Sequence, residues 1–330
     1  MIRIALFGAG RIGTIHAANV AARDDARVAV VVDPDRTAAR KLARRVGATV
    51  AEPAAVFADA AIDAVLIASS TDTHATLAIA AARAGKAIFC EKPIDLSLRR
   101  VDACLAAVRR ADVPMMVGFN RRFDPSFRTL QARLRNGEIG RIEQIVITSR
   151  DPAPPPPAYV KVSGGLFRDM AIHDLDMARW LLGEEPETVY ATGSCLVDPA
   201  IGRAGDVDSA MIILRTASGR LCHINNSRRA AYGYDQRIEA HGSAGRLIAG
   251  NLVATSVEHA GAQGVRSDPP LHFFLERYAE AYRAELDAFV SALISKKTMP
   301  VGGKDGRRAL LLADAAARSL ASGRPSRIRK

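Results

Sequence analysis

Short apolar runs alternate with alanine-rich stretches over the first third of this 330-residue chain. The runs have the length and β-branched character of buried strands, and the stretches between them are long enough for helices. Strands are expected at residues 2–7, 28–33, 64–68, 87–90 and 115–117, and helices between the first two strands and at residues 74–84 and 97–111. This alternation predicts an α/β fold whose N-terminal domain, residues 1–120, is a doubly wound parallel sheet of the Rossmann type.

The pattern changes after residue 120, where strands and helices no longer alternate. Helices are expected at residues 124–136, 165–182, 275–295 and 304–321, and strands at residues 142–148, 188–197, 207–215, 220–228 and 235–241. The segment from Asp151 to Pro157 must form a loop because its prolines fit neither a helix interior nor a central strand. Residues 121–330 are expected to form an α+β domain for substrate binding and oligomerisation, with a large, mostly antiparallel open sheet. The last helix could pack back on the first domain.

Composition and charge narrow the class of protein. The chain is 48% hydrophobic without a run of about eighteen apolar residues, and its N-terminus begins a strand rather than a signal peptide, so a soluble cytoplasmic protein is expected. The formal net charge is +11, but the basic clusters are short and aromatic residues make up 5% of the chain, which argues against nucleic-acid binding. The four cysteines show no Cys-x-x-Cys spacing, so neither a zinc site nor a disulfide framework is expected.

A glycine-rich turn lies directly between the first strand and its helix. The glycines of Gly8-Ala-Gly-Arg-Ile-Gly13 permit a tight turn and let backbone amides approach a pyrophosphate. Asp33 ends the second strand, where a carboxylate can bind the ribose hydroxyls of adenosine and favour NAD over NADP. The residues expected to bind NAD here are Gly8, Gly10, Arg11, Ile12, Gly13 and Asp33. The alternative is a plain glycine turn with a solvated Asp33.

A second polar segment follows the strand at residues 64–68, at the sheet edge where nucleotide sites form. The residues that could line the cofactor there are Ser69, Ser70, Thr71 and His74. An alternative of equal weight makes Asp72 or Thr73 the N-cap of helix 74–84 and His74 a residue of its first turn.

Three further residues suit proton and hydride transfer. Lys92, in Glu91-Lys92-Pro93 at the end of another strand, could reach a substrate hydroxyl and stabilise developing alkoxide charge. Asp169 and His173 are four residues apart, so on one continuous helix they would share a face. A histidine held by a carboxylate can accept a proton from an alcohol while a nicotinamide accepts the hydride. This set predicts a dehydrogenase.

Each of these residues also has a plainer interpretation. A lone Lys-Pro is ordinarily a surface turn, and Asp169 and His173 could be a solvated carboxylate and a core histidine. His173, Asp174 and Asp176 could bind a metal ion, but hydride transfer from an alcohol to NAD needs only a base and an oriented hydroxyl, and no second ligand cluster is apparent. No metal is therefore expected.

Taken together, four motifs resemble those of the Gfo/Idh/MocA oxidoreductase family, and the resemblance covers nearly the whole chain. The motifs are Gly8–Gly13, Glu91–Pro93, Val117–Asp124 and the segment Gly164–Asp174, which contains Asp169 and His173. Three longer segments are similar to the members of that family that oxidise inositols, namely Ser149–Pro152, Tyr159–Gly165 and Asp174–Arg179.

The resemblance implies a catalytic role for three residues. His173 would take the hydroxyl proton, Asp169 would orient His173, and Lys92 would hold the reacting oxygen and also contact NAD, as would Glu91. The implied reaction is NAD-dependent oxidation of myo-inositol to 2-keto-myo-inositol (scyllo-inosose).

The resemblance also implies substrate contacts and an assembly. Besides the catalytic set, Arg122, Asp151 and Tyr232 would contact the polyol, and Arg121 and Tyr234 are adjacent alternatives. A homotetramer or homodimer would form through the open sheet of the second domain, whose segment 207–215 is apolar on both faces.

Two other functions fit the same motifs. The substrate could be a different inositol isomer or a sugar, since the pocket residues are assigned only by analogy. A catalytically silent NAD-binding sensor could also use this fold, although it would have no need for Lys92, Asp169 and His173 together. Oxidation rates with several polyols distinguish these alternatives.

Overall fold

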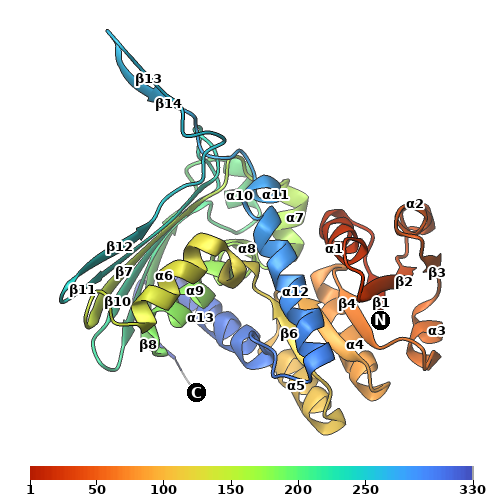
Figure 1. Cartoon of the computed structure of the whole chain (residues 1–330). Helices are drawn as coiled ribbons and strands as arrows, with labels where there is room; N and C mark the ends of the chain where they lie inside the picture. Colours follow the sequence, from red (N-terminus) through yellow and green to blue (C-terminus); the bar gives the residue numbers. More distant parts are fainter. Residues whose placement is uncertain (329–330) are drawn as a thin grey trace. The chain divides into compact units, whose positions relative to one another are not determined.

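The computed structural model describes residues 1–328 and divides the chain into two compact units (Figure 1). Unit 1 comprises Met1–Phe123 and Ala281–Leu310, and unit 2 comprises Asp124–Glu280 and Leu311–Lys330. The expected domain boundary near residue 120 lies close to Phe123, where the first segment of unit 1 ends. Residues 281–310, expected in the second domain, group with unit 1.

Unit 1 contains a six-stranded parallel sheet with the strand order β3-β2-β1-β4-β5-β6. In that order the strands are Thr49–Val50, Ala26–Val32, Ile2–Phe7, Ala64–Ile67, Ala87–Glu91 and Met115–Gly118. Strands β4, β5 and β6 are buried throughout, which explains why they read as continuous apolar runs in the sequence. The helices of this unit are α1 (Arg11–Ala21), α2 (Arg36–Val46), α3 (Pro53–Ala58), α4 (Thr71–Arg83), α5 (Leu98–Ala111) and most of α12 (Ala279–Ser295).

The order of the strands reverses at β1, which has β2 on one side and β4 on the other. At such a switch point the loops after the two central strands diverge and leave a crevice for a ligand. The expected Rossmann-type fold is confirmed, and the segments after β1, β2, β4 and β5 carry the residues expected to bind the cofactor.

Unit 2 contains a seven-stranded sheet with the order β12-β11-β7-β10-β9-β8-β15. In that order the strands are Gly245–Ala249, Asp235–Gly242, Ile142–Arg150, Leu221–Ser227, Ser209–Thr216, Pro186–Ser194 and Ser326–Arg327. Every adjacent pair is antiparallel except β7 and β10, so the expected mostly antiparallel sheet is confirmed.

Helices cover one face of this sheet (Figure 1). Helix α9 (Ala171–Leu182) packs on β7 and β10, and α6 (Pro125–Arg135) packs on β12. Strand β9 alternates buried and exposed residues, as expected of a sheet with one free face. The remaining helices of the unit are α7 (Pro157–Ser163), α8 (Gly165–Asp169), α10 (Pro199–Arg203), α11 (Phe274–Arg277) and the greater part of α13 (Gly303–Ser322).

The prediction of a single helix at residues 165–182 is wrong. Helix α8 ends at Asp169 and α9 begins at Ala171, and Met170 between them keeps a right-handed backbone conformation (φ −94°, ψ −62°) without belonging to either helix. The expected helix 275–295 is likewise two helices, α11 and α12. Residues 152–156 contain no helix or strand, as predicted, but the last proline, Pro157, is the first residue of α7.

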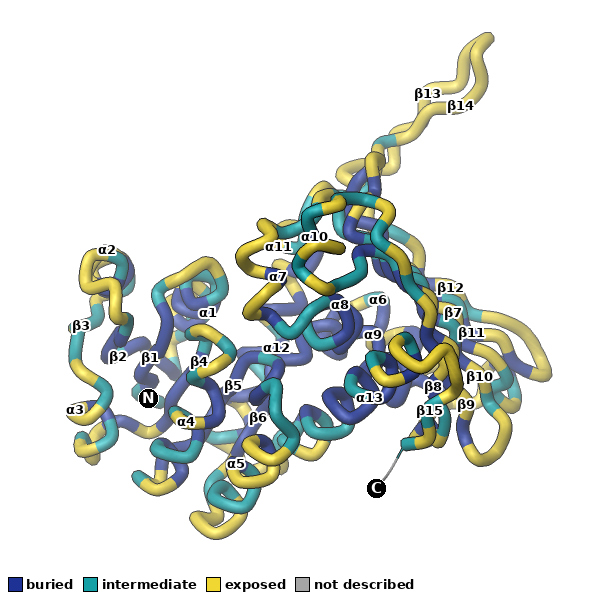
Figure 2. Tube along the Cα trace, turned by 180° about the vertical axis from the view of Figure 1, so that it is seen from behind, coloured by how far each residue is buried: buried dark blue, intermediate teal, exposed yellow. Residues whose placement is uncertain are grey.

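A two-stranded hairpin in unit 2 was not expected. Strands β13 (Glu258–Gly261) and β14 (Gly264–Ser267) consist entirely of exposed residues and extend from the rest of the unit (Figure 2). Their short, polar sequences carry no alternation that would predict a strand. None of the described helices is both long and apolar enough to cross a membrane.

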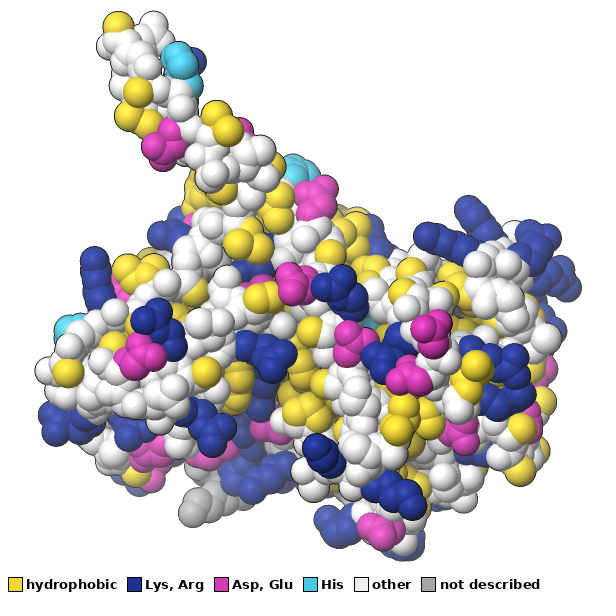
Figure 3. Space-filling view, in the orientation of Figure 1, with side chains coloured by type: hydrophobic (Ala, Val, Ile, Leu, Met, Phe, Trp, Pro, Cys, Tyr) yellow, Lys and Arg dark blue, Asp and Glu magenta, His cyan; other side chains and the backbone are white. Residues whose placement is uncertain are grey.

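The positive charge does not gather in one place on the face shown in Figure 3. Lysine and arginine side chains are spread over that face and stand among aspartate and glutamate side chains.

Candidate active site

The glycine turn after β1 leaves the first turn of α1 open. A Cβ at Gly8 (φ +104°) would lie 2.4 Å from the carbonyl oxygen of Ala68, and one at Gly13 would lie 2.0 Å from that of Gly8. A Cβ at Gly10 would meet nothing within 4 Å, and Gly10 caps the helix without a side-chain hydrogen bond. The turn is therefore packed tightly at Gly8 and Gly13, while the N-terminal amides of α1 are accessible to an anion such as a pyrophosphate.

Asp33 follows β2 and is joined to the glycine turn. One carboxylate oxygen accepts a hydrogen bond of 2.6 Å from the backbone N–H of Ala9, and the other accepts one of 2.8 Å from the N–H of Asp35. The side chain is half-buried, which leaves part of the carboxylate accessible. Gly10, the α1 amides and Asp33 thus fit a dinucleotide. Arg11 and Ile12 are the first two residues of α1, the former exposed and the latter half-buried.

The segment after β4 differs from the expected capping arrangement. The proposal that Asp72 or Thr73 is the N-cap is wrong, because α4 begins at Thr71 and Ser70 is its N-cap. The hydroxyls of Ser69 and Thr73 form a hydrogen bond of 2.6 Å, and Thr73 donates a second one to the carbonyl of Ser70. Ser70 is exposed, whereas Ser69 and Thr71 are half-buried at the carboxyl edge of the sheet.

His74 is buried and joins two segments of this edge. Its Nδ1 lies 2.8 Å from the carbonyl oxygen of Pro93, and its Nε2 lies 3.1 Å from that of Ser69. Both partners are carbonyl oxygens, which accept, so each contact is a hydrogen bond when its ring nitrogen carries a proton. His74 therefore links the segments that follow β4 and β5.

Glu91 and Lys92 lie at the end of β5. Glu91 is the last residue of the strand and is buried, and its carboxylate accepts a hydrogen bond of 2.7 Å from Nε2 of His16 in α1. Lys92 is half-buried, and its peptide bond to Pro93 is cis. Lys92 therefore lies at the same carboxyl edge as the glycine turn and Ser69.

Arg122 is buried in a turn of 3₁₀ helix after β6. The turn, η1, spans Asn120–Phe123, and Arg121 in the same turn is buried as well. Nη2 of Arg122 lies 2.9 Å from Oδ1 of Asp305, which is at the start of α13, so the two side chains form an ion pair. This ion pair fixes the orientation of the guanidinium within unit 1.

Asp169 and His173 lie on either side of the break at Met170 in unit 2. Asp169 is the last residue of α8, and His173 is in the first turn of α9, where its N–H bonds to the carbonyl of Met170. The hydroxyl of Tyr159 donates a hydrogen bond of 2.9 Å to Asp169. The four-residue spacing thus spans the boundary between two helices rather than one continuous helix.

Arg228 also contacts Asp169 and was missed by sequence reasoning. This arginine is 1% exposed, and both of its terminal nitrogens lie 3.5 Å from one carboxylate oxygen of Asp169. Asp206 lies nearby, and it accepts a hydrogen bond of 2.9 Å from the N–H of Leu166. Burial raises the pKa of Asp206, and the positive charge of Arg228 opposes that shift. No motif marks Arg228, because it reaches Asp169 only through the fold.

The two other expected substrate residues lie in segments that connect elements of unit 2: Asp151 directly after β7, and Tyr232 between β10 and β11. Asp151 follows β7, and its N–H bonds to the carbonyl of Ser227. The hydroxyl of Tyr232 accepts a hydrogen bond of 2.9 Å from Arg150 and donates one of 2.6 Å to Asp235. Tyr234, its alternative, is instead buried with its ring edge-on to Tyr278.

Among the described residues, one group of histidine and carboxylate side chains is close enough to share an ion. It consists of His16, Glu91 and Glu285, all buried in unit 1. Sequence reasoning missed it because its members come from α1, β5 and α12. Asp174, considered above as a metal ligand, accepts a hydrogen bond of 2.8 Å from the side-chain amide of Asn226.

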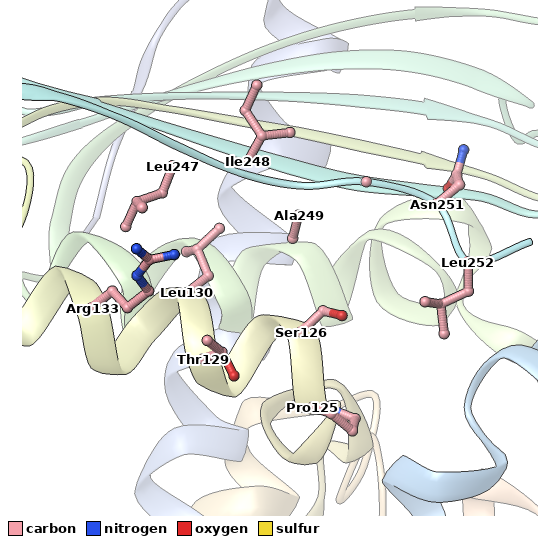
Figure 4. Close-up of a pocket in the computed structure, with 11 residues that line it drawn as sticks. Pro125, Ser126, Thr129, Leu130, Arg133, Leu247, Ile248, Ala249, Asn251 and Leu252 are labelled. Carbon is pink, nitrogen blue, oxygen red and sulfur yellow. The ribbon is translucent and has the colours of Figure 1, made fainter. Parts of the chain in front are cut away.

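A groove in unit 2 lies apart from all of these residues (Figure 4). It runs between α6 and β12, and Leu130 and Arg133 of the helix face Leu247 and Ala249 of the strand. None of the expected catalytic, cofactor or substrate residues lines it.

The parallel sheet, the glycine turn and the carboxylate after β2 define a dinucleotide-binding domain. A family model described as "Oxidoreductase family, NAD-binding Rossmann fold" matches residues 2–119, and the model "GFO/IDH/MocA C-terminal domain" matches residues 127–248. The chain belongs to the Gfo/Idh/MocA family, and residues 2–119 of unit 1 form its NAD-binding Rossmann domain.

Similar proteins match over almost the full length of the chain. An inositol 2-dehydrogenase of Rhizobium meliloti (strain 1021) is 53% identical and a myo-inositol 2-dehydrogenase of Thermotoga maritima is 50% identical, covering 98% and 97% of this chain and 98% and 96% of their own lengths. The crystal structure of a putative myo-inositol dehydrogenase from Sinorhizobium meliloti 1021 has a TM-score of 0.97 and 52% identity, with complete coverage of both chains.

Proposed function

We propose that this protein is an NAD-dependent inositol 2-dehydrogenase that oxidises myo-inositol to 2-keto-myo-inositol (scyllo-inosose). The observation that carries the proposal is the 53% identity to an inositol 2-dehydrogenase over 98% of both chains. The chain also carries Lys92, Asp169 and His173, a set of groups that suits alcohol oxidation.

His173 would act as the general base. It would accept the proton of the C2 hydroxyl through an imidazole nitrogen as the carbon–hydrogen bond breaks. Asp169 would stabilise the resulting imidazolium with its negative charge. Tyr159 and Arg228 support this role because both contact the carboxylate.

Lys92 would hold the reacting oxygen. An ammonium near that oxygen stabilises the negative charge that develops as the proton leaves, before the carbonyl has formed. When bound, NAD supplies the hydride acceptor for the hydrogen on C2. Both hydrogens of the alcohol are then accounted for, one as a proton on His173 and one as hydride.

The cofactor would be held by residues from four segments of unit 1. The amides at Gly10, Arg11 and Ile12 would bind the pyrophosphate, and Asp33 would bind the adenosine ribose. Gly8 and Gly13 would shape the turn. The contacts nearer the nicotinamide would come from Ser69, Ser70, Thr71, His74, Glu91 and Lys92.

Arg122, Asp151 and Tyr232 would bind the hydroxyls of the polyol that do not react. A ring with six hydroxyls needs several polar partners, because each buried group left without one costs about 1–3 kcal/mol. The ion pair of Arg122 with Asp305 and the hydrogen bonds of Tyr232 support this role, since they hold both side chains in place.

The test is the initial rate of NAD reduction by the purified protein with myo-inositol, scyllo-inositol, chiro-inositol and glucose, repeated with NADP. We expect a preference for myo-inositol with NAD, and loss of activity in Lys92→Ala and His173→Ala. Activity confined to another polyol would change the substrate, whereas tight NAD binding without any oxidation would indicate a sensor.

We further propose that the enzyme is a homotetramer or homodimer formed through the free face of the unit 2 sheet. On that face Tyr190, Ile213, His223 and Val146 stand opposite one another on four adjacent strands. Tyr190 is 37%, Ile213 47% and Val146 37% exposed, so the row is more apolar than a solvated surface requires. Light scattering should give an oligomer that Ile213→Glu dissociates, and a monomeric wild type at micromolar concentration would overturn the proposal.

We also propose that the enzyme acts in the cytoplasm, in the catabolism of myo-inositol. Its cysteines, Cys90, Cys104, Cys195 and Cys222, are free thiols, which suits a reducing compartment. Cell fractionation, and growth of a strain lacking the protein on myo-inositol as carbon source, would test this placement.

A further inference from the structure

Unit 1 contains a buried cluster of three titratable side chains beside the lysine proposed to hold the reacting oxygen. His16 comes from α1, Glu91 from the end of β5 and Glu285 from α12. One polar atom of each lies within 4.8 Å of those of the other two. His16 and Glu285 are 0% exposed and Glu91 is 8% exposed.

The hydrogen bonds within the cluster are incomplete at Glu285. Nε2 of His16 lies 2.7 Å from Oε1 of Glu91, and an ionised carboxylate at this distance can only accept a hydrogen bond from the nitrogen. Within residues 1–328, neither carboxylate oxygen of Glu285 has a hydrogen-bond partner. A buried carboxylate in this position must either keep its proton or acquire a cation.

The surroundings favour the neutral acid. The His16 ring packs edge-on against Phe89 and Tyr282, with centroid distances of 5.0 and 5.8 Å, so one side of the cluster is aromatic. Burial raises the pKa of Glu285 well above its ordinary value, and the negative charge of Glu91 raises it further. Two ionised carboxylates this close in an apolar setting would repel each other strongly.

A metal ion fits the same residues less well. Two ligands of one tetrahedral zinc stand about 3.3 Å apart, given metal–ligand bonds of about 2.0 Å. The distance between His16 and Glu91 is 2.7 Å, which is that of a direct hydrogen bond. An ion would have to break this contact.

We propose that Glu285 is a neutral positioning residue that donates its proton to Glu91 through one bridging water molecule, and thereby fixes the segment that carries Lys92. This inference rests on the proposed function for the role of Lys92. His16 holds the carboxylate from α1, and the backbone of Gly118 limits it from β6, since a Cβ there would lie 2.9 Å from Oε2 of Glu91. Glu285 completes the enclosure from α12.

The test compares two substitutions at position 285. Glutamine keeps a neutral donor of the same shape, so Glu285→Gln should retain the NAD dissociation constant and kcat/KM for myo-inositol within about twofold. Leucine fills similar volume without a donor, so Glu285→Leu should weaken NAD binding about fivefold and lower kcat/KM about tenfold, mainly through kcat.

Two further variants separate positioning from packing. Phe289 is fully buried on the same helix and packs edge-on against Phe89, so Phe289→Leu should lower the Tm and leave kcat unchanged. Gly118→Ala keeps Glu285 but displaces Glu91, so it should reproduce the kinetic loss of Glu285→Leu.

The outcomes are distinct. Equal loss in the glutamine and leucine variants would overturn the proposal, because the ionised group would then be needed. So would wild-type behaviour of Glu285→Leu, or one equivalent of a divalent metal bound in the purified protein and lost in that variant. If the wild type oxidises no polyol, the proposed function fails, but the NAD dissociation constants still test the cluster.

Discussion

The hydroxyl of Tyr159 donates a hydrogen bond to the carboxylate of Asp169 over 2.9 Å, from a helix that precedes Asp169 in the chain. Although the ring is half exposed, the desolvation of its hydroxyl raises the pKa of Tyr159, and the charge of Asp169 raises it further. Tyr159 therefore remains a hydrogen-bond donor throughout the neutral pH range. The contact fixes the carboxylate that we propose to orient His173.

We expect Tyr159→Phe to lower kcat/KM for myo-inositol about threefold to tenfold, because one hydrogen bond to Asp169 is lost while Arg228 remains. The melting temperature should not change, since the tyrosine is exposed. Val162→Ala, at an exposed position of the same helix, is the matched control and should keep wild-type kinetics. Unchanged kinetics in the phenylalanine variant would show that this hydrogen bond does not support catalysis.

The glycine turn predicts opposite effects at two positions. Gly10→Ala should fold normally because its Cβ meets nothing within 4 Å, but it should weaken NAD binding at least about tenfold by filling the approach to the α1 amides. Gly13→Ala should lower the melting temperature, because its Cβ would lie 2.0 Å from the carbonyl oxygen of Gly8. Calorimetric titration with NAD and thermal unfolding measure both effects.

Gly302→Ala serves as the control for this pair, since a Cβ there also meets nothing within 4 Å and Gly302 lies outside the turn. Tight NAD binding by Gly10→Ala would mean that the pyrophosphate does not approach the turn.

Asp33 should set the preference between NAD and NADP. Asp33→Asn keeps an oxygen that can accept the hydrogen bond from Ala9, but it removes the charge that would repel a 2′-phosphate. We expect the ratio of kcat/KM for NAD to that for NADP to fall at least about tenfold. Asp35→Asn, which conserves the cap of α2, should leave the ratio unchanged, and an unaltered ratio in Asp33→Asn would contradict the assignment.

Most of the unit 1 sheet could be predicted from sequence, because strands β4, β5 and β6 are buried throughout. Continuous apolar runs such as Ala64–Ile67 and Ala87–Glu91 have few other interpretations, and the glycine turn between a strand and a helix locates the dinucleotide site. Strand β3 was not predicted, because its two residues, Thr49 and Val50, are too few to show a periodicity. The local hydrophobic pattern was therefore sufficient to predict strands that are fully buried and that alternate with helices along the chain.

The environment of Asp169 could not be predicted in the same way. The break at Met170 depends on local backbone geometry that apolar spacing does not record. Arg228 lies 59 residues from Asp169 in the sequence. It directly follows β10, and the register of β10 with β7 and β9 brings that end of the strand to Asp169. Glu285 was missed for a related reason, because a glutamate on an amphipathic helix is ordinarily solvated.

The buried Glu285 predicts a specific dependence of stability on pH. Its pKa is raised in the folded protein above the ordinary value of 4.5, so the folded state holds a proton that the unfolded chain releases as the pH rises. The contribution of this acid to stability is therefore complete below pH 4.5 and declines as the pH rises toward its folded-state pKa. Glutamine at position 285 has no proton to release.

The difference in Tm between Glu285→Gln and the wild type should therefore grow in favour of the variant from about pH 5 to about pH 8. Other titrating groups, including the neighbouring His16, Glu91 and Tyr282, are present in both proteins, so the difference isolates position 285 to first order. Thermal unfolding at matched ionic strength across this range measures it. A difference that stays constant with pH would mean that the folded and unfolded chains hold the same number of protons at Glu285, and the acid would then be ionised in the native cluster.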